Sequence, residues 1–340
     1  MRKRVLSILN YFIFLGGGLF LVWWQLKTMT SAEKNEFYGS LKSANYWIII
    51  PIAIMSILSH VSRSMRWKLL MEPLGYKPKL SNIFSVTMIG YLANAAVPRL
   101  GELLKCTFLA RYEKLKVDKL VGTIILERSF DVICYFIFIL ITILIQIDTV
   151  SDFLKKELNQ INSNPGTPIW LKFCILLVGI ITFISILKWL LKKFPENKII
   201  SKILSFINGI WTGFQSIKHL KKRKVFLIHT VFIWAMYLGQ VYLGFWGMEA
   251  TADLSIKAAF SVLTLTTLSM IVTPGGIGSF PIFVMQTLLI YGIDAPVGKA
   301  FGWIMWGVST SLIILIGLLC LITIPYFNKS SDESNAIPQE

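Results

Sequence analysis

The stretch Asn94-Ala-Ala-Val-Pro-Arg-Leu-Gly-Glu102 places an arginine and a glutamate inside a long apolar run. Arg99 offers a planar fork of donors that suits a phosphate or a carboxylate. Glu102 follows three residues later, which is near enough on a helical turn to pair with Arg99. The backbone N–H groups of a helix that begins after Pro98 would add anion-binding donors. We interpret the stretch as a binding site for an anionic headgroup. The alternative is that Arg99 and Glu102 only neutralise each other.

A second group of charges follows in Glu127-Arg128-Ser-Phe-Asp131. On a helix, Glu127 and Asp131 are four residues apart and share one face, and Arg128 precedes Asp131 by three residues. Two carboxylates in this position can take up a proton or form an ion pair with the guanidinium of Arg99. A structural network of ion pairs, which fixes the packing without a role in turnover, is the alternative.

The third stretch is Thr273-Pro-Gly-Gly-Ile-Gly278, in which glycine and proline interrupt another apolar run. Gly275 and Gly276 would let the backbone approach a ligand closely, and Thr273 can cap the helix that follows. A simple turn is the alternative. Interrupted helices in corresponding halves of a chain are typical of transporter binding sites, so we predict that this break faces the substrate.

The amino-acid composition indicates the class of protein in which these stretches lie. The 340 residues are 55% hydrophobic and 15% charged, whereas soluble domains average about 45–50% and about 25%. The sequence therefore predicts an all-α polytopic membrane protein. The net charge of +16 comes from basic residues that lie between apolar runs, which indicates membrane topology rather than a nucleic-acid partner. The four cysteines and three histidines lack ligand spacing, so we expect neither a metal nor another cofactor.

The apolar runs divide the chain into six predicted full spans and two re-entrant hairpins. Each full span has close to the roughly 20 residues that a membrane-crossing helix needs. We expect residues 1–328 to form one transmembrane domain, with a cytoplasmic basic segment at 192–224 that includes an amphipathic helix. A short polar cytoplasmic tail is expected at 329–340. The full spans are predicted at 5–26, 46–70, 118–147, 169–191, 225–247 and 300–326.

The hairpins are predicted from charge. If residues 80–97 crossed the membrane fully, the interval Lys105–Lys119, with net charge +3, would lie outside. Because cytoplasmic loops retain Lys and Arg, we instead expect the chain to turn back at Val97–Gly101. The run that breaks at 273–281 would enter from the opposite side, which gives the pattern of an inverted repeat. Both termini are then cytoplasmic.

The three stretches, in this order and on this pattern of spans, resemble the flippase-like transmembrane domain of the lysylphosphatidylglycerol synthases. The resemblance implies a protein of the bacterial or archaeal inner membrane that acts on lipids, since the synthase relatives translocate an aminoacylated phospholipid. Two departures matter. Only 14 residues follow Tyr326, so we expect no aminoacyl-transferase domain and no lysyl transfer. Many relatives also carry a glutamate shortly after the second break, where this chain has Ser279-Phe-Pro281.

We therefore expect a flippase-type transporter of an anionic or aminoacylated phospholipid, with membrane lipids as its partners and no enzymatic activity. In this hypothesis Arg99 grips the headgroup, the charges at 102, 127, 128 and 131 balance or gate it, and the Pro-Gly-Gly break is the opposing gate. Two other functions stay open. One is a transporter of small solutes or ions, and the other is a non-catalytic membrane partner of a lipid- or glycan-modifying enzyme. A homo-oligomer is also possible.

Overall fold

Every regular element in the part of the chain that the structure describes is a helix. The computed structural model describes residues 16–97, 100–146 and 220–333. Residues 16–27 form the first described helix. The remaining α-helices are α2 (Ser31–Ser43), α3 (Ile49–Met71), α4 (Leu80–Ala96), α5 (Leu100–Glu113), α6 (Val117–Ile145), α10 (Arg223–Phe245), α11 (Ile256–Val272), α12 (Ser279–Leu289) and α13 (Ala295–Glu333). Short 3₁₀ turns are η1 (Tyr46–Ile48), η2 (Glu72–Leu74), η3 (Glu249–Thr251) and η4 (Pro274–Gly276).

Four of these helical segments are long and apolar enough to cross a membrane. Each has at least 23 residues, which at 1.5 Å per residue spans more than about 30 Å of hydrocarbon. The predicted all-α polytopic membrane fold is confirmed. The segments are Tyr46–Leu74, Val117–Ile145, Arg223–Phe245 and Ala295–Asn328.

The total number of spans stays a prediction, because part of the span predicted at 5–26 and all of the one at 169–191 lie outside the described residues. Most of the basic segment 192–224, including its amphipathic helix, lies outside them too. At the C-terminal end, α13 continues to Glu333. The first residues of the predicted polar tail are therefore helical.

The chain divides into two compact units, residues 1–127 with 219–340 and residues 128–218. In the second unit the structure describes residues 128–146, which continue helix α6. There the Thr142 hydroxyl donates to the carbonyl of Phe138 one turn earlier (2.9 Å). All the contacts discussed below belong to the first unit.

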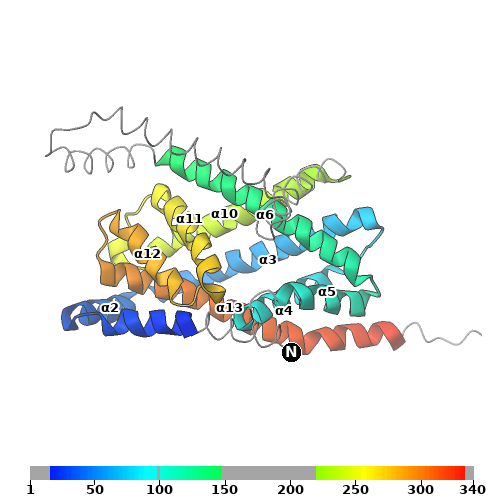
Figure 1. Ribbon diagram of the computed structural model, residues 1–340, viewed down its shortest axis with the longest axis horizontal. Helices are drawn as coiled ribbons and strands as arrows, with labels where there is room; N and C mark the ends of the chain where they lie inside the picture. Colours follow the sequence, from blue (N-terminus) through cyan, green and yellow to red (C-terminus); the bar gives the residue numbers. More distant parts are fainter. Residues whose placement is uncertain (1–15, 98–99, 147–219, 334–340) are drawn as a thin grey trace, which may run out of the picture. The chain divides into compact units, whose positions relative to one another are not determined.

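Helices α3 and α10 lie along each other in opposite directions (Figure 1). Near the C-terminal end of α3, Arg66 stacks its guanidinium over the Phe226 ring close to the start of α10. At the other end, the Asn45 N–H, just before η1, donates to the carbonyl of Gly247, just after α10 (2.7 Å). Helices α3 and α10 are therefore antiparallel.

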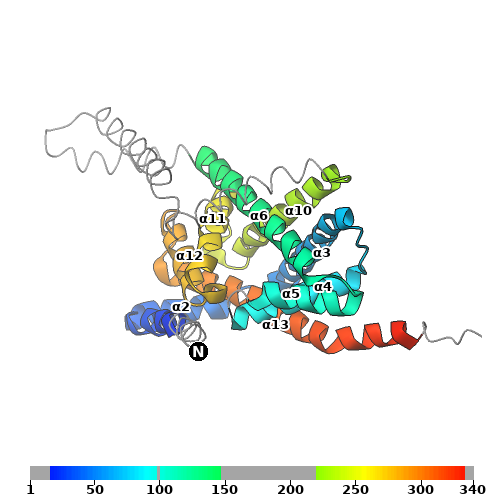
Figure 2. The ribbon, with the colours of Figure 1, turned by 45° about the vertical axis from the view of Figure 1, so that its right-hand side comes forward.

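Helices α4 and α5 form a helical hairpin, which lies beside α3 in Figures 1 and 2. At the base, the Lys79 N–H and the Asn82 amide both donate to Glu113 Oε1, at 2.9 and 2.6 Å. Near the tip the two backbones pass so closely that a Cβ added at Gly101 would overlap the Gly90 carbonyl. Small residues at a crossing permit such an approach between membrane helices. The chain thus returns to the level at which the hairpin began.

Helices α11 and α12 form the second hairpin, and its break lies where the sequence predicts it. The base is joined by a hydrogen bond between the hydroxyls of Ser261 and Tyr291 (2.9 Å). In the break, three glycines have φ between 60° and 72°, a region in which glycine has no Cβ penalty. These glycines are Gly275, Gly276 and Gly278.

The two hairpins approach from opposite ends, because each follows one of the antiparallel helices α3 and α10. They meet where α4 contacts η4, the break of the second hairpin. Helix α13 packs against both, with Gly317 against Leu92 of α4 and Gly302 against Pro281 of α12. The opposed, broken elements expected from the sequence are therefore present, and a single long helix supports them.

The closed base of the first hairpin makes a prediction about sidedness. Lys77 and Lys116 flank the hairpin and are exposed. If the hairpin is re-entrant, cysteines at these two positions react with an impermeant maleimide from the same side of the membrane. A cysteine at Lys42, beyond the opposite end of α3, should react from the other side. The measurement is labelling of intact cells and of inverted vesicles in a background without native cysteines. Reaction of positions 77 and 116 from opposite sides would contradict the re-entrant geometry.

The glycine crossing makes a second prediction. A Cβ at position 101 would overlap the Gly90 carbonyl and the Asn94 side chain, so Gly101→Ala should destabilise the protein by about 1–3 kcal/mol. The matched control is Gly307→Ala in α13, where a Cβ meets nothing within 4 Å. That change should be neutral or slightly stabilising, because alanine favours a helix. Thermal unfolding in detergent measures both effects, and equal midpoints for the two variants would count against a tight crossing.

Candidate functional site

A buried cluster of charges lies between α3, α5 and the first part of α6. Glu127 is only 2% exposed, and three cationic side chains surround it. Its Oε1 is 3.5 Å from Nη1 of Arg63 and 3.7 Å from Nη2 of Arg66. Its Oε2 is 3.1 Å from Nζ of Lys105. We call these four residues the charged cluster.

The cations of the charged cluster are buried as well. Arg66 is fully buried, Lys105 is 8% exposed and Arg63 is 9% exposed. Charges removed from water in this way are costly unless they are paired and hydrogen-bonded. Removing the Glu127 carboxylate would leave three buried cations that lack this partner. The cluster is therefore a strongly coupled unit.

Lys105 is held from two sides. Its ammonium lies 3.9 Å from the centre of the Trp67 ring, which is a cation–π contact. Trp67 is completely buried and donates its indole N–H to the Thr123 hydroxyl (2.9 Å). That hydroxyl donates in turn to the carbonyl of Leu120 (2.7 Å). The tryptophan fixes Lys105 against α6, next to Glu127.

Helix α10 adds polar groups beside the two arginines. Nη1 of Arg66 lies 3.4 Å from the Thr230 hydroxyl, and Nη2 of Arg63 lies 3.4 Å from the Tyr237 hydroxyl. Next to them, the Ser62 hydroxyl is 2.9 Å from Nδ1 of His229. The antiparallel α3–α10 pair thus contributes neutral donors and acceptors to the same region.

Sequence reasoning found one member of the charged cluster, Glu127, and missed the other three. Lys105 belongs to the basic interval that predicts the first hairpin, and Arg63 and Arg66 lie near the end of the span predicted at 46–70. Charge counting uses such residues only as signals of membrane topology, whereas the structure places their side chains against Glu127. The sidedness of these segments stays a prediction. Helical spacing would have given a signal, since Arg63, Arg66 and Trp67 recur at intervals of three and four residues on one face.

At the first break the structure joins Asn94 to the start of α5. The Gly101 N–H donates to Asn94 Oδ1 (2.8 Å), and Asn94 Nδ2 donates to Glu102 Oε1 (3.4 Å). The amide therefore satisfies an N-terminal donor of α5 and contacts Glu102 from α4. Arg99 lies outside the described residues, so its predicted pairing with Glu102 stays a prediction.

Glu127 and its predicted companions differ in burial. Arg128, in the second unit, is exposed and Asp131 is half-buried, whereas Glu127 is buried. The helical spacing explains why adjacent residues face different surroundings. Glu127 is the member of this group that joins the charged cluster.

At the second break the polar groups are directed at the chain itself. The Thr273 hydroxyl donates to the carbonyl of Ile277 (3.0 Å) and lies 2.6 Å from the Ser279 hydroxyl. Thr273 therefore closes the break, and the N-cap of α12 is Gly278, which has no side-chain cap. The Gly275 carbonyl accepts from the indole of Trp306 (2.7 Å), and Gly276 is buried. At the break that was predicted to face the substrate, a backbone carbonyl thus already accepts a hydrogen bond from α13.

Helix 16–27 also contacts the second break. The Gln25 amide donates to the Gly278 carbonyl (2.8 Å), and Gln25 is 2% exposed. A Cβ at position 278 would lie 2.7 Å from the Gly18 carbonyl. Together with Trp306, this helix holds the second break in place.

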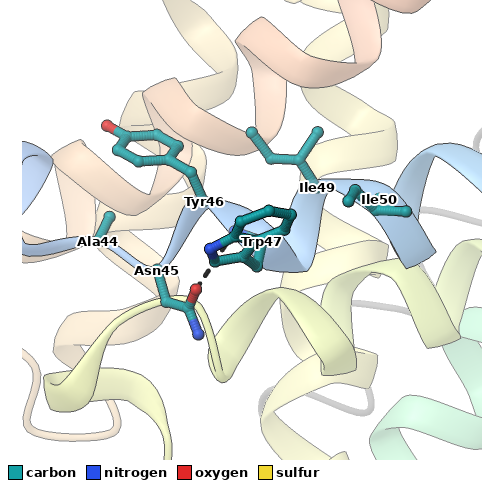
Figure 3. Close-up of a pocket in the computed structure, with 6 residues that line it drawn as sticks. All are labelled: Ala44, Asn45, Tyr46, Trp47, Ile49 and Ile50. Carbon is teal, nitrogen blue, oxygen red and sulfur yellow. Dashed lines mark hydrogen bonds between the residues drawn. The ribbon is translucent and has the colours of Figure 1, made fainter.

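A surface hollow of about 570 Å³ lies at the start of α3 (Figure 3). None of its six lining residues is charged, and Asn45 uses its side-chain oxygen to accept from the Trp47 N–H (3.2 Å). Trp47 is 78% exposed, as expected for an aromatic residue at a membrane interface. Arg63 is 13 residues beyond Ile50, which is about 20 Å along the helix. We therefore place the candidate site at the charged cluster and not at this hollow.

No group of three or more potential metal ligands among His, Cys, Asp and Glu occurs in residues 16–97, 100–146 and 220–333. At the charged cluster, the guanidinium groups of Arg63 and Arg66 and the ammonium group of Lys105 are groups that can bind an anion. In the structure they contact the Glu127 carboxylate.

The sequence matches the family described as the lysylphosphatidylglycerol synthase TM region over residues 7–317. It is also 24% identical over 313 residues to the UPF0104 membrane protein MJ1595 of Methanocaldococcus jannaschii. That alignment covers 88% of this chain and 91% of the relative. No solved structure matches the chain significantly.

The Asn94 bridge yields a prediction. Asn94→Ala removes the acceptor for the Gly101 N–H, and losing such a cap costs about 0.5–2 kcal/mol. We expect a lower unfolding midpoint in detergent for this variant. Asn35→Ala, on the exposed surface of α2, is the control and should change the free energy of unfolding by no more than about 0.5 kcal/mol. A midpoint for Asn94→Ala equal to that of the control would show that the bridge does not stabilise the tip.

Proposed function

We propose that this chain, which belongs to the lysylphosphatidylglycerol synthase TM region family, binds the headgroup of an anionic or aminoacylated phospholipid and moves it across the membrane. The observation that carries the proposal is the charged cluster. Three buried cations gather around one carboxylate between membrane helices. Ionisable groups at such positions are rare and mark substrate or ion pathways.

The arginines suit the chemistry of a phospholipid headgroup. A guanidinium presents several donors in one plane and matches the oxygens of a phosphate, and Arg63 and Arg66 project from the same helix into one cluster. An aminoacylated headgroup carries an amine as well as a phosphate, and the Glu127 carboxylate can accept from that amine. The cluster therefore offers partners for both ends of such a headgroup.

The opposed hairpins support transport rather than binding alone. Broken helices from two halves that meet inside the membrane are the arrangement around which alternating-access transporters move. In this protein α4 of the first hairpin contacts the break of the second. We propose that movement of one hairpin past the other exposes the charged cluster to each side in turn. Arg99 lies outside the described residues, and its predicted grip on the headgroup remains part of the proposal.

The proposal also gives a location and an orientation. The protein would reside in the cytoplasmic membrane of a bacterial or archaeal cell. Both termini would be inside, because cytoplasmic segments are rich in Lys and Arg and the strongly basic segment 192–224 is therefore expected to face the cytoplasm. It would act as a transporter and not as an enzyme.

Reconstitution tests the proposed function. Proteoliposomes are prepared with phosphatidylglycerol, lysylphosphatidylglycerol or phosphatidylcholine that carries a fluorophore on one acyl chain, and dithionite quenching reports movement between leaflets. We expect movement of at least one of the first two lipids. It should fall about tenfold or more in Arg66→Gln, because the variant loses a buried guanidinium donor of the charged cluster. Arg99→Ala should also reduce it.

The matched control is Arg111→Gln, because this arginine is exposed in the last turn of α5 and should leave transport unchanged. All variants are first shown to elute as monodisperse protein. Absence of movement of every lipid in the wild type, or equal rates in Arg66→Gln, would contradict the proposal. Uptake of a water-soluble anion without lipid movement would instead favour a small-solute or ion transporter.

A further inference from the structure

The two oxygens of Glu127 have different surroundings. Oε1 is shared by both arginines of α3, whereas Oε2 contacts the ammonium of Lys105. The carboxylate therefore joins two cationic groups that come from different helices. The arginines belong to α3, which packs along α10, and the lysine belongs to the first hairpin.

The contacts on the arginine side are long. Nη1 of Arg63 and Nη2 of Arg66 lie 3.5 and 3.7 Å from Oε1, whereas charge-assisted N–H···O bonds are about 2.7–2.9 Å. Both guanidiniums approach the same oxygen of Glu127, so these contacts with the carboxylate are not the two parallel bonds of a bidentate pair. A phosphate has more oxygens to offer and can accept from both side chains at short range. The arginine side is thus better suited to a phosphate than to the carboxylate that contacts it.

The contact on the lysine side is shorter and better supported. Nζ of Lys105 lies 3.1 Å from Oε2 and 3.9 Å from the centre of the buried Trp67 ring. The ring is fixed by its hydrogen bond to Thr123. If the arginines receive another anion, Glu127 can keep its bond to Lys105 while Oε1 moves away. The carboxylate has a fixed side and an exchangeable side.

We propose that Glu127 is an internal counter-ion that a phosphate replaces at Arg63 and Arg66, while Lys105 retains the carboxylate. This inference rests on the proposed function and specifies how its site takes and releases ligand. In the empty state the carboxylate partly neutralises the arginines and limits the cost of burying them. When the phosphate leaves, Oε1 returns. Glu127 is thus a positioning residue that weakens binding and speeds release.

The ligand chemistry is a phosphate ester or phosphate, which a lipid headgroup or free phosphate can supply. We expect the lipid, because the cluster lies between membrane helices. Binding to purified protein in detergent distinguishes the sources through three probes. These are dihexanoyl phosphatidylglycerol, inorganic phosphate, and dihexanoylglycerol, which has the acyl chains without the phosphate. Binding of the first probe alone supports a lipid phosphate, and binding of inorganic phosphate with equal affinity would overturn the lipid source.

The decisive variant is Glu127→Gln, which keeps the side-chain volume and removes the charge. If the carboxylate competes with the ligand, the dissociation constant for dihexanoyl phosphatidylglycerol should fall by about tenfold, and release of the ligand should slow by a similar factor. Lipid movement in proteoliposomes should then fall although binding is tighter. A role that is only structural would weaken binding and transport together.

Glu127→Asp provides the second test, because Glu127→Gln can fail to fold once three buried cations lose their carboxylate. The aspartate keeps the negative charge, but its side chain is one methylene shorter. While its carboxylate contacts Lys105, it cannot also reach the two arginines. The variant should therefore also bind the lipid more tightly than wild type. The matched control is Glu249→Gln in η3, where the carboxylate is exposed and the dissociation constant should not change.

The outcomes separate this inference from the proposed function. If the wild type binds and moves a phospholipid but neither Glu127 variant binds it more tightly, counter-ion exchange is wrong and the transport proposal stands. If the wild type neither binds nor moves any phosphate-bearing lipid, both are wrong. Tighter binding with slower release in either variant supports the exchange.

Discussion

The burial of Glu127 among three cations constrains how three helices of the described structure pack. It joins α3, α5 and α6 at one point. Breaking a buried ion pair by removing one partner costs about 3–5 kcal/mol, which is a large fraction of the stability of an ordinary domain. The same charges that hold the helices together are those best suited to bind an anion. In the proposed function, stability and ligand binding at this site are therefore coupled.

The two hairpins have similar topology, whereas their chemistry differs. Antiparallel α3 and α10 each lead into a broken hairpin, and α4 reaches the break of the opposing hairpin. The first break brings together Asn94 and Glu102, next to the charged cluster on α3 and α5. In the second break, two glycine carbonyls accept hydrogen bonds from Gln25 and Trp306. The Thr273 hydroxyl donates to a carbonyl within the same break. The charged groups of the two hairpin regions are therefore concentrated at the first hairpin.

The family of lysylphosphatidylglycerol synthase TM regions connects this arrangement to lipids. The archaeal relative, which aligns over most of both chains, is described only as a membrane protein. What the present chain adds is the identity of the buried residues: two arginines three positions apart on one helix, and a lysine held over a tryptophan. These groups define a site that can be examined in any member of the family.

The membrane class, the long apolar helices and both breaks can be predicted from the amino-acid sequence, because hydropathy over about 20 residues and the backbone preferences of Pro and Gly are local properties. The sequence also identifies Glu127 as an ionisable residue inside a span. That Arg63, Arg66 and Lys105 surround Glu127 is seen only in the folded chain. Counting charges along the chain cannot separate a lysine or arginine that faces the cytoplasm from one that is buried, since the difference depends on which distant helix packs against it. The partners of Glu127 lie 22 to 64 residues away, and helix packing alone brings them together.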